Sequence, residues 1–238
     1  MFLEIPTIER RLDAFEWMDG PCSTEECARC LRDLGTVNHL LLAYRPTLKW
    51  LEQFIDGSGS ALHIVDVGCG AGDMLRSIEA WTDKRHLPVH LTGIDRNTSA
   101  ISAARTFTHS ESRIEWHCCD VNEYQPASPV DVVISSLVAH HLQDDEIVRF
   151  LQWMEGTALR GWFVNDLERR LISYYSFMLL AKLMRWHPFV QHDGPVSILR
   201  SFVPADWINY SNRAGIPSEK ICMFRAHPGR LCVSRVMQ

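Results

Sequence analysis

The chain has 238 residues, of which 46% are hydrophobic and 22% are charged, so it can bury a core in one large domain or in a domain with a cap. Its net charge is −5 and no long run of Lys or Arg is present. This argues against nucleic acid as the main partner, because phosphate binding needs a basic face. The opening residues are charged and amphipathic rather than signal-like, and the eight cysteines are scattered, so we expect reduced thiols in a cytoplasmic protein.

The first 57 residues are predicted to be helical. Ile8, Leu12 and Phe15 recur at helical spacing, and a second apolar stripe, interrupted by Gly35, runs through 24–44. Pro46 suits the first turn of a third helix. The Gly- and Ser-rich segment that follows predicts a hinge. We therefore expect an N-terminal helical cap over 1–57 and a second domain over 58–238.

Three cysteines in the cap have the spacing C-x4-C-x2-C, which also begins a plant-type iron–sulfur motif. They are Cys22, Cys27 and Cys30. No suitably placed fourth ligand is evident, and a helix with Cys27 and Cys30 on one face explains the pattern as well. We favour the helix.

After the hinge, strand-like and helix-like segments alternate. The predicted strands are 62–67, 89–95, 113–120, 130–136 and 160–166. The predicted helices between them are 72–81, 98–107 and 144–156. This alternation is typical of an α/β fold with a doubly wound, mostly parallel sheet and right-handed crossovers.

An insert after the fifth strand, 167–203, breaks this rhythm. Its apolar part, 170–186, is short for a membrane span and contains Lys182 and Arg185, so we expect a core or capping helix and no stable membrane insertion. A membrane-surface role is the alternative. A loop is predicted over 187–202. The chain then predicts a helix over 204–215 and a hairpin of strands 220–226 and 230–236.

The turn after the first strand carries three glycines at every second position, Gly68, Gly70 and Gly72. Such a turn at the carboxyl end of a parallel strand lets the backbone approach a ligand. Asp66 and Asp73 flank it. Carboxylates repel a dinucleotide's diphosphate and suit a ligand that carries an ammonium or sulfonium group. The turn therefore favours S-adenosylmethionine over NAD.

Two further acids end the next strands. Asp95 ends the second strand, where a carboxylate can accept both ribose hydroxyls of either cofactor. Asp120 ends the third, where it can accept from an adenine amino group. Alone, Asp95 could be a helix cap and Asp120 a turn residue. Asp66, the three glycines, Asp95 and Asp120, in this order, are harder to explain as separate caps and turns.

The motifs VDVGCGAGD, LTGID, CCDV and VDVVISSLVAHHL resemble, in this order, those of class I S-adenosylmethionine-dependent methyltransferases, over roughly 62–165. The resemblance implies a seven-stranded Rossmann-like sheet with an antiparallel last strand, and S-adenosylmethionine as cofactor. It also implies the contacts to the cofactor. The methionine moiety would contact Asp66, Gly68, Cys69 and Gly70, and the ribose would contact Asp95 and Arg96. The adenine would contact Asp120 and Val121, and the sulfonium would lie beside Ser136 and Leu137. A narrower similarity is to bacterial methyltransferases of aromatic, polyketide-derived or quinone-type small molecules.

A base is needed if the methyl acceptor is a hydroxyl group. His140 and His141 follow the fourth strand, and His192, beside Asp193, lies in the insert; we favour His141. Arg45 is expected to reach the carboxylate of the cofactor from the cap.

No metal is predicted. The fourth strand ends in Ser135 and Ser136, where metal-dependent catechol methyltransferases need an acid, and Asn165 and Asp166 occur in the reverse of the required order.

The aromatic residues of the cap and the insert favour a flat or lipophilic small-molecule acceptor. We expect both segments to close over the carboxyl ends of the strands. The predicted function is a methyltransferase of secondary metabolism, with O-methylation favoured over C-methylation and the oligomeric state open. The alternative is a catalytically silent protein that binds an adenosyl cofactor or a partner.

Overall fold

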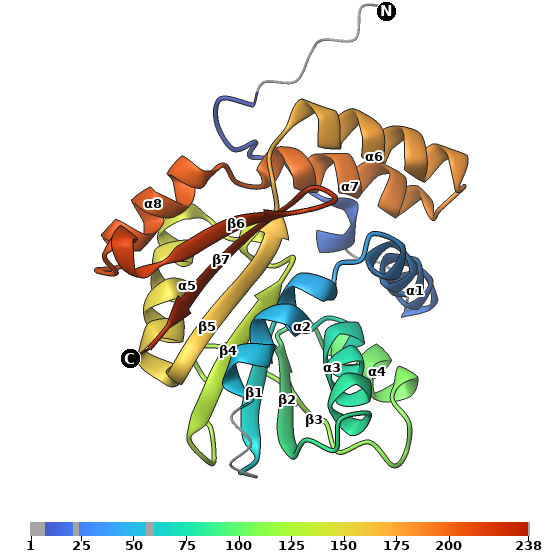
Figure 1. Ribbon diagram of the computed structural model, residues 1–238. Coiled ribbons are helices and arrows are strands. Elements are labelled where there is room, and N and C mark those ends of the chain that lie inside the picture. The colour runs from blue at the N-terminus through green and yellow to red at the C-terminus, as the bar shows by residue number, and fades with distance from the viewer. Residues whose placement is uncertain (1–7, 21–23, 56–59, 238) are drawn as a thin grey trace, which may run out of the picture.

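The computed structural model describes residues 8–20, 24–55 and 60–237 (Figure 1). Most of the predicted hinge, 56–59, lies outside the described residues, and so does Cys22 of the cysteine motif. No helix within the described ranges is long and apolar enough to cross a lipid bilayer.

The sheet has seven strands in the order β3-β2-β1-β4-β5-β7-β6, with β7 antiparallel to both β5 and β6. The strands are β1 (Leu62–Val67), β2 (Val89–Asp95), β3 (Glu115–Cys118), β4 (Val130–Ser136), β5 (Ala158–Leu167), β6 (Cys222–Ala226) and β7 (Arg230–Val236). This confirms the predicted mostly parallel seven-stranded sheet with a terminal antiparallel hairpin. Strand order reverses between β1 and β4, which is where open parallel sheets bind ligands.

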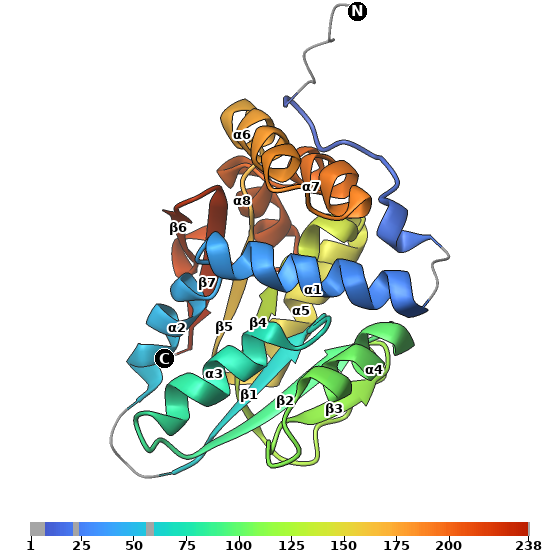
Figure 2. The same ribbon diagram turned by 90° about the vertical axis from the view of Figure 1, so that its right-hand side faces the viewer.

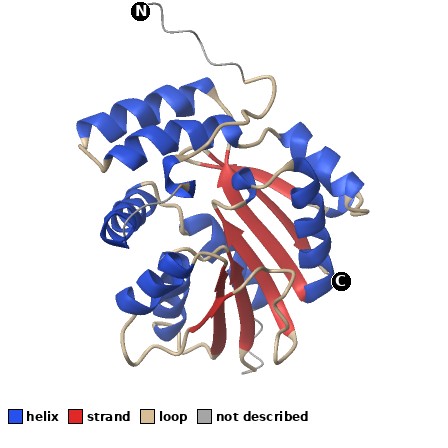
Figure 3. Ribbon diagram, turned by 180° about the vertical axis from the view of Figure 1, so that it is seen from behind, coloured by secondary structure: helices blue, strands red, loops and turns tan. Residues whose placement is uncertain are grey.

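Helices cover both faces of the sheet, as the view from behind shows (Figure 3). One face packs against α2 (Arg45–Leu51), α3 (Asp73–Asp83) and α4 (Thr98–Phe107). The other packs against α5 (Asp144–Thr157) and α8 (Pro204–Arg213). The central strands are apolar on both faces: Ile64 of β1 belongs to one core cluster and its neighbour Val65 to the other, as expected of a buried parallel strand.

Three helices lie over the carboxyl ends of the strands: α1 (Thr24–Leu40), α6 (Leu171–Leu183) and α7 (Pro188–Arg200) (Figures 1 and 2). They share a third apolar cluster that includes Cys30 and Val37 of α1, Ala181 of α6 and Val190 of α7. The end of the sheet that these helices cover is the one expected for the cap and the insert.

The predicted helix at the start of the chain is wrong. Residues 8–16 form an irregular strap, and only Trp17–Asp19 form a single 3-10 turn. The strap is held by contacts to distant elements: Leu12 N donates to Leu199 O, and Arg11 donates to the carbonyls of His140, Leu142 and Arg200. These tertiary contacts outweigh the weak helical pattern, and Leu12 and Phe15 remain exposed.

The predicted loop at 187–202 is also wrong, because α7 occupies most of it. Pro188 stands in the first turn, where a missing N–H costs nothing, and Pro195 is accommodated inside the helix. Gly194 allows α6 to approach closely, since a Cβ there would lie 2.0 Å from the ring of Phe177. The glycine and the prolines therefore serve packing rather than a loop.

The expected cap is not packed as a separate unit. Gly35 does not interrupt α1, and α2 belongs to the central core, where the ring of Trp50 stacks on Phe163 with centroids 5.0 Å apart. Leu51 and Phe54 are buried in the same cluster. Deleting the first 55 residues would therefore remove side chains that belong to the core.

Candidate functional site

The glycine turn joins β1 to α3, and Gly68, Gly70 and Gly72 all have positive φ. A Cβ at Gly68 would lie 2.2 Å from Val138, and one at Gly72 would lie 2.2 Å from the Trp116 ring. A Cβ at Gly70 would meet nothing within 4 Å. Two glycines thus serve close packing within the protein, while the backbone at Gly70 faces open space that a ligand can approach.

Asp66 lies at the end of β1, beside this turn. It is buried, and its Oδ1 accepts no hydrogen bond from any described residue. Burial, and then the charges of Asp73 and Asp95, raise the pKa of Asp66 well above its usual range. A buried carboxyl group without a partner is costly, and a cationic ligand would satisfy it.

Asp95 ties the second strand to the glycine turn. Its Oδ2 accepts from Gly70 N at 2.9 Å and its Oδ1 from Asn97 N at 2.8 Å, so its carboxylate is held facing the turn. Asp120 instead accepts from the backbone and side chain of Asn122 through Oδ1, in the local turn that the alternative interpretation expected. Its neighbour Val121 is half-buried, and Arg96 is exposed.

The end of β4 is the next part of the site. Ser136 lines a cavity of about 30 Å³. The other residues around this cavity are Asn38, Tyr44, Asp66, Gly68, Cys69, Asp73 and Met74. Leu137 has φ +59, which is rare for a residue with a branched side chain, and its N–H donates to Asn165 O. Backbone strain of this kind gathers at functional sites.

The cap closes this cavity through contacts to Asp73, which we call the cap latch. Tyr44 Oη donates to Asp73 Oδ2 at 2.7 Å and Asn38 Nδ2 donates to the same oxygen at 3.0 Å. Arg230 of β7 donates to Asn38 Oδ1 at 3.2 Å. Burial, and then the charge of Asp73, raise the pKa of Tyr44, so the phenol keeps its proton and remains a donor.

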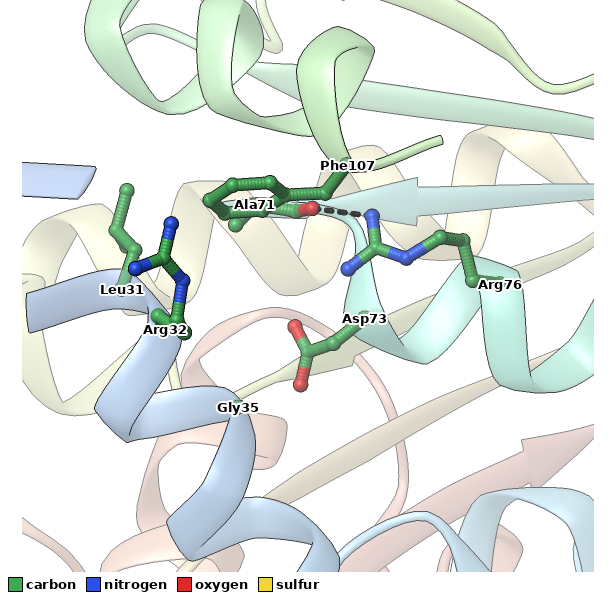
Figure 4. Close-up of a pocket in the computed structure, with 7 residues that line it drawn as sticks. All are labelled: Leu31, Arg32, Gly35, Ala71, Asp73, Arg76 and Phe107. Atoms are coloured by element: carbon green, nitrogen blue, oxygen red, sulfur yellow. Dashed lines mark hydrogen bonds between the residues drawn. The ribbon is translucent and has the colours of Figure 1, made fainter. Parts of the chain in front are cut away.

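A second hollow, of about 210 Å³, lies on the other side of Asp73 (Figure 4). Leu31, Arg32 and Gly35 of α1 face Ala71, Asp73, Arg76 and Phe107 across it. Arg76 Nη1 donates to Ala71 O at 2.6 Å, which fixes the outer side of the glycine turn. Because α1 and Asp73 line both hollows, a displacement of α1 would enlarge both.

Two adjacent histidines occupy the 3-10 turn Ala139–His141 after β4. His140 Nδ1 lies 2.7 Å from Asp166 Oδ1, and both side chains are buried. Burial alone would raise the pKa of Asp166, but the charge of His140 and its hydrogen bond lower it overall. The side chain of His141 is 28% exposed against 3% for His140, so His141 is the one that an acceptor can reach.

Glu16 of the strap faces both histidines. Its Oε1 lies 4.0 Å from His140 Nε2 and its Oε2 lies 3.9 Å from His141 Nε2. Arg200 Nη1 donates to Glu16 Oε1 at 3.2 Å. The ligand atoms of Glu16, His140 and His141 lie within 4.8 Å of one another, close enough to hold a metal ion.

Two predicted site residues lie elsewhere. His192, on α7, stacks on Trp17 with centroids 3.9 Å apart, and its Nδ1 lies 2.7 Å from Asp193 Oδ1. Asp193 also accepts from the N–H groups of Trp17 and Met18, so this group anchors the 3-10 turn that follows the strap. Arg45 is exposed on α2 and does not line the 30 Å³ cavity.

Most aromatic residues of the cap and the insert, which were expected around the acceptor, also lie elsewhere. Phe177 and Trp186 pack in the third cluster, and Tyr175 is exposed.

Sequence reasoning missed Glu16 and the pairing of His140 with Asp166. The pairing of His140 with Asp166 could have been predicted from the strands. β4 and β5 are neighbours, with Ser136 opposite Asn165, so the residues just beyond them must lie close together. The position of Glu16 could not have been predicted in this way, because no local sequence pattern indicates where the strap packs.

Comparisons with known proteins agree with this architecture. Residues 64–157 match the family model of a methyltransferase domain. The ubiquinone biosynthesis O-methyltransferase of a Bradyrhizobium species is 29% identical over 140 residues, covering 56% of this chain and 51% of that protein. The malonyl-[acyl-carrier protein] O-methyltransferase of Acetivibrio thermocellus is 34% identical over 88 residues, covering 37% and 29%.

Solved structures share the fold. The plantazolicin methyltransferase BpumL, in complex with a substrate analogue and SAH, has a TM-score of 0.66 at 16% identity and covers 93% of this chain and 92% of that one. The magnesium protoporphyrin IX methyltransferase of Synechocystis has a TM-score of 0.57 at 14% identity, covering 93% and 91%.

The strand order and these matches define the fold as that of the solved methyltransferases, and residues 64–157 are similar to a methyltransferase domain. Over its central region the chain is also similar to curated O-methyltransferases. The chain spans about half the length of the ubiquinone-pathway relatives that it matches.

Proposed function

We propose that the chain is an S-adenosylmethionine-dependent methyltransferase that methylates a hydroxyl group of a small, aromatic or lipophilic acceptor. The observation that carries the proposal is the buried Asp66 carboxyl group with an unpartnered oxygen, placed beside a glycine turn and two more acids. This donor set fits a cationic adenosyl ligand and disfavours a diphosphate.

The residues that would hold the cofactor follow the turn. Asp66 and the backbone at Gly68 and Gly70 face the cationic part, with Cys69 buried behind them. Asp95 keeps acceptor capacity for the ribose hydroxyls, because each of its oxygens accepts one backbone hydrogen bond and has a second lone pair. When bound, S-adenosylmethionine supplies an electrophilic methyl group on a sulfonium.

The proton is taken by the histidine pair. We assign His141 as the base, since its side chain is the more exposed, and Glu16, 3.9 Å away, stabilises the charge that the ring acquires. His140 and Asp166 form the buried support of this arrangement and fix the 3-10 turn from below. Arg200 holds Glu16 in place.

We further propose that this chemistry uses no metal. Glu16 is already paired with Arg200, a fixed cation, and Asp166 is committed to His140 and to the N–H groups of His140 and Leu167. A divalent ion between Glu16 and the two histidines would have to compete with the guanidinium.

The acceptor class rests on the relatives and on the apolar cap. Ubiquinone biosynthesis O-methyltransferases match this chain over its central region, which favours a phenolic acceptor with an apolar tail. A cytoplasmic location and the absence of a nucleic-acid partner remain predictions from charge and cysteine content. The catalytically silent alternative gains no support from these relatives.

The test is methyl transfer from S-adenosylmethionine to a panel of alkyl-substituted catechols and phenols, read by mass spectrometry. We expect a product heavier by one methylene unit, with S-adenosylhomocysteine formed in equal amount. If the protein binds cofactor but methylates neither itself nor any member of the panel, the catalytically silent binding protein is favoured instead.

A further inference from the structure

The outer face of α6 carries an exposed apolar stripe. Ile172, Tyr175, Leu179 and Leu183 follow one another at spacings of three and four residues, which puts them on one side of the helix. Leu179 and Leu183 are 69% and 75% exposed. Of the thirteen residues of α6, all described, Ala181 alone is buried. A largely apolar helix this exposed is unusual in a protein surrounded by water.

The segment that carries the stripe has charges of one sign. The sequence from 169 to 192 contains no acidic residue, although the whole chain has a net charge of −5. Lys182 and Arg185 are exposed beside the end of the stripe. The nearest preceding acid, Glu168, is buried and paired with Arg170 and Arg225, so it adds no negative charge to this face.

The position of α6 in the fold determines which way the stripe faces. α6 packs on α7 by its inner side, where Phe177 fits against Gly194, and the two helices form the outermost layer over the carboxyl ends of the strands (Figure 1). The stripe therefore faces outward on the same end of the molecule as the glycine turn and the histidine pair.

We propose that this stripe is a docking surface for an anionic membrane. An apolar helix face with basic residues beside it binds in the plane of the lipid headgroups without crossing the bilayer, and an exposed tyrosine suits that interface. A second copy of the chain is a poorer occupant, because pairing through the stripe would place Lys182 and Arg185 opposite the same segment of the other copy, and residues 169–192 contain no acid. The proposal does not depend on the proposed methyl transfer.

The experiment is cosedimentation of the full chain with lipid vesicles, without cofactor or acceptor. One set of vesicles is phosphatidylcholine alone and the other contains equal parts of phosphatidylcholine and phosphatidylglycerol. We expect binding to the second set that weakens with salt. Leu179→Glu and Leu183→Glu should each reduce it by more than about tenfold, because each would bury a charge in place of a leucine. Changing both Lys182 and Arg185 to Gln should reduce it by about 25-fold, at about fivefold a charge.

Matched controls lie at the other end of the molecule. Leu159→Glu changes a leucine that is 60% exposed at the start of β5, and Lys84→Gln removes an exposed charge at the end of α3; neither should alter binding. The proposal is overturned if the wild type binds neither set of vesicles, or if the α6 variants bind as the controls do. It is also overturned if the wild type sediments as a dimer that Leu179→Glu dissociates, with no vesicle bound.

Discussion

Asp166 Oδ1 lies 2.7 Å from His140 Nδ1, and this contact joins the end of β5 to the turn that follows β4. Asp166 also accepts from the N–H of His140 and of Leu167. One buried carboxylate therefore fixes the position of the whole histidine pair, although the ring that an acceptor can reach is that of His141.

Replacing Asp166 with Asn should lower the turnover number by about a hundredfold or more, since the histidine pair would lose its fixed orientation. The Michaelis constant for the acceptor and the affinity for cofactor should change little, because neither ligand needs this contact. Steady-state kinetics and calorimetry check the two parts. Unchanged turnover in a folded variant would show that the pair serves structure alone.

His141→Gln should lower the turnover number by about 10²–10⁴-fold, the usual contribution of a general base. The matched control is His192→Gln, which alters a histidine that stacks on Trp17 away from the pair. We expect that variant to keep most of its activity. If His192→Gln is the more damaging change, the base has been assigned to the wrong residue.

The cap latch should slow the entry of cofactor. Tyr44→Phe removes the 2.7 Å hydrogen bond to Asp73, so α1 should open more often and S-adenosylmethionine should associate several-fold faster in stopped-flow measurements. Tyr174→Phe, on α6, is the control. Slower or weaker binding to Tyr44→Phe would mean that the phenol holds the cofactor rather than the cap.

The stability of the ligand-free protein should depend on Asp66. Its pKa is raised in the folded state, so the protonated carboxyl favours folding at acid pH, and ionisation destabilises the fold as pH rises through the raised pKa. Urea unfolding should show stability falling over that range, and Asp66→Asn should remove this part of the fall. The prediction fails if both proteins have the same pH profile.

Activity should survive the removal of divalent metal. The Glu16 cluster could hold an ion, but Arg200 already supplies its positive charge. We expect equal turnover before and after EDTA. A loss that zinc or magnesium restores in the wild type, but not in Glu16→Gln, would establish a metal centre at these residues.

What the sequence predicted depends on how local each signal is. The glycine turn, Asp66 and Asp95 lie within or just beyond single strands, so alternating strands and helices locate them. The strap and α7 were mispredicted because distant contacts determine them: Arg11 binds carbonyls of α7 and of the turn after β4, and Gly194 with Pro195 sits inside a helix. The role of Glu16 follows from the path of the strap alone, which no local pattern encodes.

Titration calorimetry with S-adenosylmethionine, S-adenosylhomocysteine and NAD tests the central claim, the cofactor site, most directly. We predict that both adenosyl ligands bind and that NAD does not. Asp95→Ala should weaken binding by about 1.5–3 kcal/mol, through loss of charge-assisted hydrogen bonds to the ribose, while Asp95→Asn should weaken it less. Tight binding of NAD, with no response to either adenosyl ligand, would contradict the account.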